Sequence, residues 1–135
     1  MISLIVGKKG SGKTKRLIDL VNEATKTSSG NVVCIEKGTK LTYDINHNAR
    51  LIDIDKFGIA DSNSFYGFLA GMEAANYDIT DVYVDGVMKI CNDDLGCLAA
   101  LFDRIEGLTA SFSIKFYFAV SVDESELPES IKKYL

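Results

Sequence analysis

The sequence predicts an α/β fold, a three-layer αβα sandwich around a mainly parallel sheet. Short apolar runs that fit buried strands alternate with segments of helical periodicity along the 135 residues. This alternation is typical of parallel strands covered by helices on both faces. A glycine-rich segment lies between the first apolar run and the first helix, and several of the runs end on a polar side chain. Ligands of such sheets bind beyond the carboxyl ends of the strands.

Two buried strands joined by a helix are predicted in the first third of the chain. Ile2–Val6 is apolar and short, as in a central strand. Apolar residues then recur at helical spacing, so a helix runs from about Lys13 to Thr27 and is broken by Ser28-Ser29-Gly30. A second apolar strand, Asn31–Glu36, ends on a carboxylate.

Two short extended segments follow, and they predict a β-hairpin. Lys40–Ile45 and Arg50–Ile54 flank the polar triplet Asn46-His47-Asn48, a composition typical of a turn. His47 is the only histidine of the chain and is interpreted as a turn residue.

The second half of the chain continues the alternation of helices and strands. Apolar residues at helical spacing predict two amphipathic helices, and two apolar runs predict strands. The elements are, in order, a helix capped by Ser62 or Ser64 and ending near Tyr77, a strand at Asp81–Asp85, a helix from about Asp93 to Leu108, a strand at Ile114–Ser121, and a short final helix with Pro128 in its first turn.

Composition narrows the class of protein. A chain of 135 residues with 47% hydrophobic residues fits one domain, residues 1–135, with a packed core. No apolar run approaches the roughly 20 residues that span a bilayer, so we expect no membrane insertion. The net charge of −4 argues against a nucleic-acid partner. The odd set of three cysteines without a CxxC pair indicates reduced thiols and a cytoplasmic protein.

The glycine-rich segment matches the spacing G-x-x-x-x-G-K-[ST] of a phosphate-binding loop. Its glycines allow a tight turn that brings successive N–H groups toward one anion, and the following helix adds its positive end. Lys13 would reach the β- and γ-phosphates, and Thr14 would offer a hydroxyl to Mg²⁺. The residues predicted to hold the nucleotide here are Gly7, Lys8, Lys9, Gly10, Ser11, Gly12, Lys13, Thr14 and Lys15. No N-K-x-D base-reading motif occurs, which favours ATP over GTP.

Three strand ends supply further candidates. Asp85 closes a buried strand and is the candidate second group for Mg²⁺. Glu36, at the end of the strand after the loop helix, is the candidate for orienting water toward the γ-phosphate, although a solvated strand-end charge fits its position equally well. Ser121 could contact the γ-phosphate. Asp123 could do so too, or could provide negative charge for the last helix.

With these residues in place, the chain resembles the P-loop NTPases, and among them the RecA-like ATPases. The resemblance rests on GKKGSGKT, on VYVD at Val82–Asp85, and on Glu36. In RecA-like proteins, which include pilus-retraction motors, the catalytic glutamate ends the strand after the P-loop helix. The resemblance implies a minimal core of this kind with an added β-hairpin, in which the last strand separates the P-loop strand from the Asp85 strand and brings Ser121 beside the phosphates. A fifth core strand of the family is not evident.

Three functions remain open from the residues. The first is a Mg²⁺-dependent ATPase or ATP-driven switch, with Lys13 and Glu36 as catalytic residues. The second is a small-molecule kinase, similar in outline to bacterial thymidine kinases but without their zinc module. The third is a non-hydrolysing nucleotide-binding module whose hairpin or Asp55–Asp61 loop docks a protein partner. The sequence leaves open whether such a partner, or a homo-oligomer, exists.

Overall fold

A five-stranded parallel sheet forms the centre of the computed structural model, which describes residues 1–135. The strands lie in the order β1-β5-β4-β2-β3, and every neighbouring pair is parallel. Their bounds are β1 Ile2–Gly7, β2 Asn31–Glu36, β3 Ala49–Asp53, β4 Ile79–Asp85 and β5 Lys115–Ser121. All five carboxyl ends therefore meet at one edge of the sheet.

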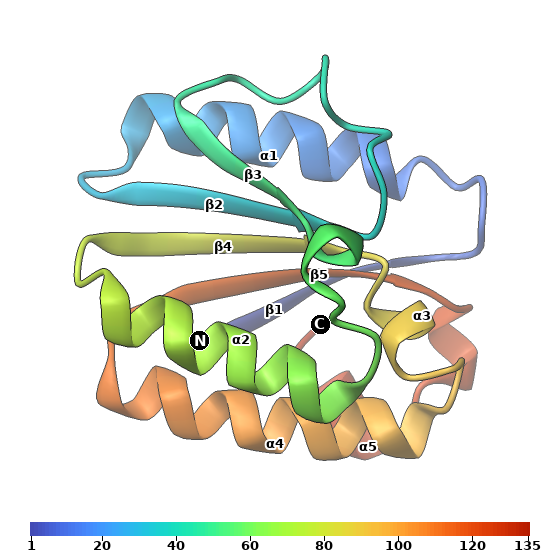
Figure 1. Cartoon of the computed structure of the whole chain (residues 1–135). Coiled ribbons are helices and arrows are strands. Elements are labelled where there is room, and N and C mark those ends of the chain that lie inside the picture. Colours follow the sequence, from blue (N-terminus) through green and yellow to red (C-terminus); the bar gives the residue numbers. More distant parts are fainter.

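Helices cover both faces of the sheet and complete the three-layer sandwich (Figure 1). Helix α1 lies alone on one face, and α2 and α4 lie side by side on the other. The helices are α1 Lys13–Thr27, α2 Ser62–Ala75, α3 Val87–Ile90, α4 Leu95–Ser111 and α5 Glu129–Lys132, with 3₁₀ turns η1 Ile54–Phe57 and η2 Glu124–Glu126. The predicted fold class is confirmed.

The apolar residues divide into two clusters, one on each face of the sheet. Because successive side chains of a strand point to opposite faces, the cluster to which each residue belongs tells which face it occupies. On β4, Val82 and Val84 belong to the larger cluster under α2 and α4, whereas Tyr83 belongs to the cluster under α1. Asp85, two residues after Tyr83, therefore lies on the α1 face.

The predicted hairpin is wrong, and the strand it contained has another role. Lys40–Ile45 forms turns, not a strand. Ala49–Asp53 pairs parallel with β2, with Val32 opposite Ala49 and Glu36 opposite Asp53. It thereby supplies the fifth strand that the sequence did not reveal, at the edge of the sheet beyond β2.

The first strand was expected in the centre of the sheet, but β1 is an edge strand that pairs only with β5. The remaining differences are local. The N-cap of α2 is Asp61, not Ser62 or Ser64: its carboxylate accepts from the N–H of Ser64 at 2.8 Å, while the Ser64 hydroxyl accepts in return from the Asp61 N–H. Helix α3 is too short to show a periodicity, and it was not predicted. Pro128 is the N-cap of α5. All three cysteines are free thiols. None of the helices is both long enough and apolar enough to cross a membrane.

Candidate functional site

The glycine-rich loop connects β1 to α1 at the carboxyl edge of the sheet. Gly10 and Gly12 have φ of 84° and 91°, a left-handed conformation that only glycine adopts at little cost. Gly7 is required for a different reason, since a Cβ at this position would collide with the hydroxyl of Ser11. The N–H of Ser11 donates to the carbonyl oxygen of Lys8 at 3.0 Å and closes the turn. The loop is thus tightly curled.

Several backbone N–H groups of this tightly curled loop have no acceptor within the protein. Within the loop and the first turn of α1, the following N–H groups donate to no protein atom: Lys8, Lys9, Gly10, Gly12, Lys13, Thr14 and Lys15. The first-turn donors are free because a helix has no intrahelical acceptors for them. No acidic side chain lies in this first turn, so the positive end of the α1 dipole is not compensated from within the helix. Such an arrangement favours an anion.

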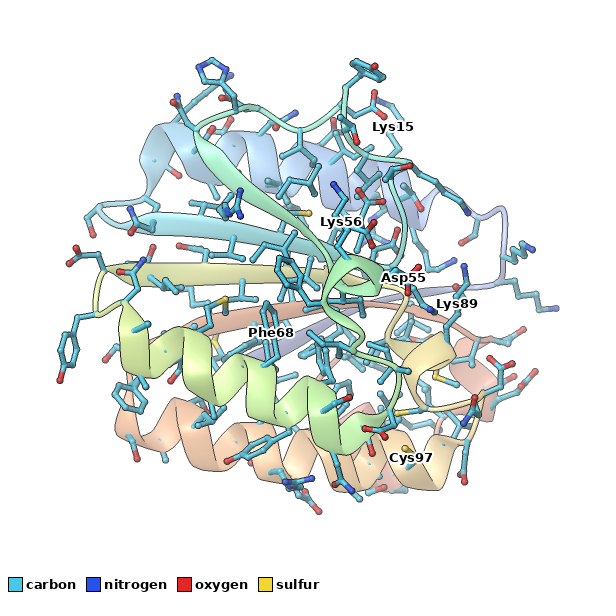
Figure 2. The ribbon with its side chains drawn as sticks, viewed as in Figure 1. Lys15, Asp55, Lys56, Phe68, Lys89 and Cys97 are labelled. Atoms are coloured by element: carbon cyan, nitrogen blue, oxygen red, sulfur yellow. The ribbon has the colours of Figure 1, made fainter.

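Lys13 is the buried cation of this site. It is 7% exposed, and its Nζ donates to the carbonyl oxygen of Lys8 at 3.2 Å. The loop thus folds around the ammonium. The side chains of Lys9, Ser11, Thr14 and Lys15 are exposed, and Lys15 lies on the outer side of α1, where it pairs with Asp19 (Figure 2).

The three strand-end candidates share one edge and one face of the sheet. Ser121 is in register with Gly7, so β5 places it beside the start of the loop. Alternation along the strands places Ser121, Asp85 and Glu36 on the face covered by α1. The order β1-β5-β4-β2 separates Glu36 from Gly7 by three strand spacings, about 14 Å at 4.8 Å each. The strand order implied by the RecA-like resemblance, with the last strand between the other two, is confirmed.

Glu36 is buried and held by the chain that follows it. It is 3% exposed, and both carboxylate oxygens accept from the N–H of Leu41, at 3.2 and 3.3 Å. Burial raises the pKa of Glu36; hydrogen bonds from the backbone of Leu41 and Lys40 act against the rise, and the charges of Asp53 and Asp85 add to it. The carboxyl group is therefore fixed in place and is more basic than an ordinary glutamate.

Asp85 differs from Glu36 in having no partner. Its carboxylate is half-buried and makes no hydrogen bond or ion pair with the protein. Gly86, with φ of 88°, turns the chain immediately afterwards, and a Cβ there would lie 3.5 Å from the Cβ of Lys37. No group of three or more His, Cys, Asp or Glu side chains could hold a metal by itself. A hydroxyl from Thr14, one carboxylate from Asp85 and oxygens from a ligand nevertheless suit Mg²⁺, which takes few protein ligands and keeps several waters.

Two more acidic residues lie at this edge of the sheet. Asp53 was not among the residues predicted from the sequence, and the role of Asp123 was left open. Asp53 is opposite Glu36 in register and accepts from the N–H groups of Gly38 and Asp55, both at 2.9 Å. It was missed because β3 was assigned to a hairpin. Asp123 caps η2 and also lies 3.3 Å from the ammonium of Lys8. This ion pair joins the glycine-rich loop to the end of β5.

A pocket of about 530 Å³ adjoins Glu36 on the side away from the loop. It lies between β3 and the segment from 38 to 48, and most of its lining is polar. Glu36 and Asp53 line it together with His47, Arg50 and Lys56, so His47 is at a pocket and not only in a turn. Figure 2 shows Asp55 and Lys56 on η1, the turn that follows β3.

The fold and the loop together define an α/β sandwich compatible with the P-loop class. The particular likeness is to a solved structure of the pCW3 conjugation coupling protein TcpA, in its monomer form with ATPγS, at a TM-score of 0.55 and 16% sequence identity. The match covers 98% of this chain and 46% of that chain, so this chain spans less than half of its length. No protein-family model matches the sequence. A search of curated proteins finds no match either. The likeness establishes a shared fold.

Proposed function

We propose that this chain is a single nucleotide-binding domain that binds ATP with Mg²⁺ and works as an ATPase or ATP-driven switch of the RecA-like type. One observation carries the proposal. Seven unpaired N–H groups and the ammonium of Lys13 lie within one short loop and the first turn of the helix that follows it, at the positive end of that helix. Such a loop favours a multiply charged oxyanion. The fold likeness to a protein solved with ATPγS supports the same conclusion.

The triphosphate is proposed to lie along the loop, with its β- and γ-phosphates against the amides from Lys8 to Lys15. Lys13 exchanges the carbonyl oxygen of Lys8 for phosphate oxygens, which form stronger, charge-assisted hydrogen bonds with it. Thr14 and Asp85 would hold Mg²⁺, whose contribution is to neutralise charge on the phosphates. Ser121, in register with Gly7, is positioned to donate to the γ-phosphate.

Hydrolysis is assigned to Glu36. Water attacks the γ-phosphorus as the bond to the β,γ-bridging oxygen breaks, and the products are ADP and phosphate. Glu36 accepts the proton of the attacking water, and its raised pKa makes it a better base near neutral pH than an ordinary carboxylate. The hydrogen bonds from Leu41 fix the position of this carboxyl group.

A second candidate function is phosphate transfer to a small molecule. The pocket of about 530 Å³ favours it, since the pocket adjoins Glu36 and has polar groups that could hold an acceptor hydroxyl. Glu36 would then take the proton of that hydroxyl in place of the proton of water.

Phosphate release and nucleotide affinity, measured together, test these functions. We expect slow release of phosphate from Mg²⁺-ATP, no acceleration by nucleosides, and loss of turnover in Glu36→Gln with ATP still bound. Glu23→Gln, an exposed glutamate of α1, is the matched control and should turn over normally. Unchanged turnover in Glu36→Gln would remove Glu36 from the mechanism. Turnover that requires a nucleoside would establish the kinase, and tight binding without turnover would establish a non-hydrolysing module.

A further inference from the structure

A second pocket, of about 330 Å³, lies at the opposite edge of the sheet from the glycine-rich loop. It is formed by the α2–β4 and α4–β5 connections, where β4 and β5 begin. Its lining includes Glu73, Asn76, Tyr77, Ser111, Phe112 and Ser113, and it contains no lysine, arginine or histidine. The function proposed above makes no use of this pocket.

Glu73 is the unusual residue of this pocket. It lies in the last turn of α2, is 2% exposed, and neither of its carboxylate oxygens has a hydrogen-bond partner. Burial raises the pKa of Glu73, and the charge of the N-terminal ammonium opposes the rise. That ammonium donates to the carbonyl oxygen of Ile114 at 3.1 Å and makes no bond to Glu73. A buried carboxyl group with no partner costs stability, so its retention here requires a reason.

Two helix ends add to the negative potential of the same pocket. Helix α2 ends at Ala75 and α4 ends at Ser111, and both connections that follow line the pocket. The carboxyl end of a helix carries a partial negative charge and is usually complemented by a basic side chain in the last turn. Neither α2 nor α4 has a basic residue there. The carboxylate of Glu73 and the two helix ends therefore all make the electrostatic potential in the pocket more negative.

Aromatic rings complete the lining at the mouth of the pocket. Tyr77 and Phe112 are 89% and 37% exposed, so both residues are accessible from solvent. Aromatic faces attract cations, and the attraction adds to that of a carboxylate. Hydroxyl groups of Ser111 and Ser113 offer acceptors for further donors.

We propose that this pocket binds an organic cation, a primary ammonium or guanidinium group, which stacks against Tyr77 or Phe112 and is attracted by the charge of Glu73, whose carboxylate oxygens are closed to solvent behind the lining. The cation could belong to a free alkylamine or to an arginine or lysine side chain of another protein. The chemistry at the pocket is the same in both cases.

Titration of the whole chain with agmatine, followed by calorimetry and by ¹H–¹⁵N NMR, tests the proposal. A capped Gly-Arg-Gly peptide forms the second arm, and N-butylurea serves as a neutral analogue. We expect agmatine or the peptide to shift the amide resonances of Asn76, Tyr77 and Ser113, and butylurea to leave them unchanged. A response to agmatine alone would assign a free cation, and a response to the peptide would assign a protein side chain. Absence of shifts with both cations would overturn the proposal.

Substitutions test whether Glu73 supplies the negative charge that attracts the cation. Glu73→Gln should weaken the binding of agmatine at least about tenfold, because it removes the buried negative charge that attracts the cation. Glu106→Gln is the matched control. It removes an exposed carboxylate whose charge also acts on the N-terminal ammonium, and this variant should bind agmatine as tightly as the wild type does. If Glu73→Gln does not fold, Tyr77→Ala replaces it, with Tyr43→Ala, 98% exposed on another loop, as its control. Equal affinities in the wild type and in the Glu73→Gln or Tyr77→Ala variant used would contradict the proposal.

Discussion

The ammonium of Lys13 lies 3.2 Å from the carbonyl oxygen of Lys8, so the residue that begins α1 reaches back across the loop that precedes it. The loop is therefore folded around a positive charge of its own. This relationship depends on the left-handed conformation of Gly10 and Gly12, which turns the chain within a few residues. Binding then requires the exchange of one acceptor for another, without refolding of the loop.

The conformation of Gly12 leads to the first prediction. Gly12→Ala should lower the free energy of unfolding by about 1–2 kcal/mol, because alanine is strained in the left-handed region, although nothing lies near its Cβ. The strain also opposes the curled loop, so nucleotide affinity should fall. Urea unfolding and calorimetry measure the two effects.

Gly67→Ala is the matched control for Gly12→Ala. Gly67 is exposed in the middle of α2 with equally open space around its Cβ, and alanine there should stabilise the protein by about 0.5–1 kcal/mol. Equal effects of the two substitutions would contradict a special role for the loop conformation.

A second prediction concerns Asp85. Since its carboxylate has no partner in the protein, Asp85→Asn should cost little stability. It should weaken ATP binding about 10- to 100-fold in the presence of Mg²⁺, and leave binding in EDTA unchanged. Calorimetric titrations under both conditions measure the difference, with Asp44→Asn, an exposed aspartate of the 38–48 segment, as control. The same loss of affinity in EDTA would show that Asp85 does not act through the metal.

The ion pair between Lys8 and Asp123 leads to a third prediction. The two side chains are 72% and 36% exposed, and exposed ion pairs stabilise a protein little, so Asp123→Asn should leave stability nearly unchanged. The substitution also removes a negative charge beside the loop and frees Lys8, so Mg²⁺-ATP should bind up to about fivefold more tightly, and the gain should decrease with added salt. Weaker binding by Asp123→Asn would indicate that this carboxylate itself serves the nucleotide.

Stability should depend on pH through the two buried glutamates. Burial raises the pKa of both Glu36 and Glu73 above the ordinary value of 4.5, so the folded chain binds their protons more tightly than the unfolded chain. The free energy of unfolding should therefore fall as pH rises from 4.5. The lowered pKa values of Asp61 and Asp123 act in the opposite direction, but below 3.8. Urea unfolding between about pH 4.5 and 6.5 measures the slope.

The double variant Glu36→Gln, Glu73→Gln is the control for that slope. Both side chains then lose their titration, and the unfolding free energy should become nearly constant over this range. A slope that survives in the double variant would have to come from other groups.

Most of the fold was predictable because its determinants are local. The apolar runs of β1, β2 and β4 and the periodicity of α1 are visible in a few consecutive residues each, and so is the spacing from Gly7 to Thr14. The partner of Ala49–Asp53 was not predictable in this way. Whether this segment pairs with Lys40–Ile45 or with β2 depends on contacts distant in sequence, and the polar residues before it favoured the nearer choice.

The residues of the candidate site were likewise predictable only where the signal is local in the sequence. The residues of the loop, Asp85 and Ser121 follow from their places at strand ends, whereas Asp53 depended on the unpredicted strand. The burial of Glu36, which sets its basicity, depends on the segment to Leu41 folding over it. The orphaned carboxyl group of Glu73 had no counterpart in the sequence, where it lies within an amphipathic helix like any polar residue.

The most direct test of the account is calorimetric titration of Mg²⁺-ATPγS into the wild type and Lys13→Ala, with Lys26→Ala in the last turn of α1 as the control for loss of a lysine. We predict saturable binding by the wild type and Lys26→Ala, and no detectable binding by Lys13→Ala. Absence of binding by the wild type, or equal affinity in all three proteins, would contradict the assignment of the loop to a nucleotide.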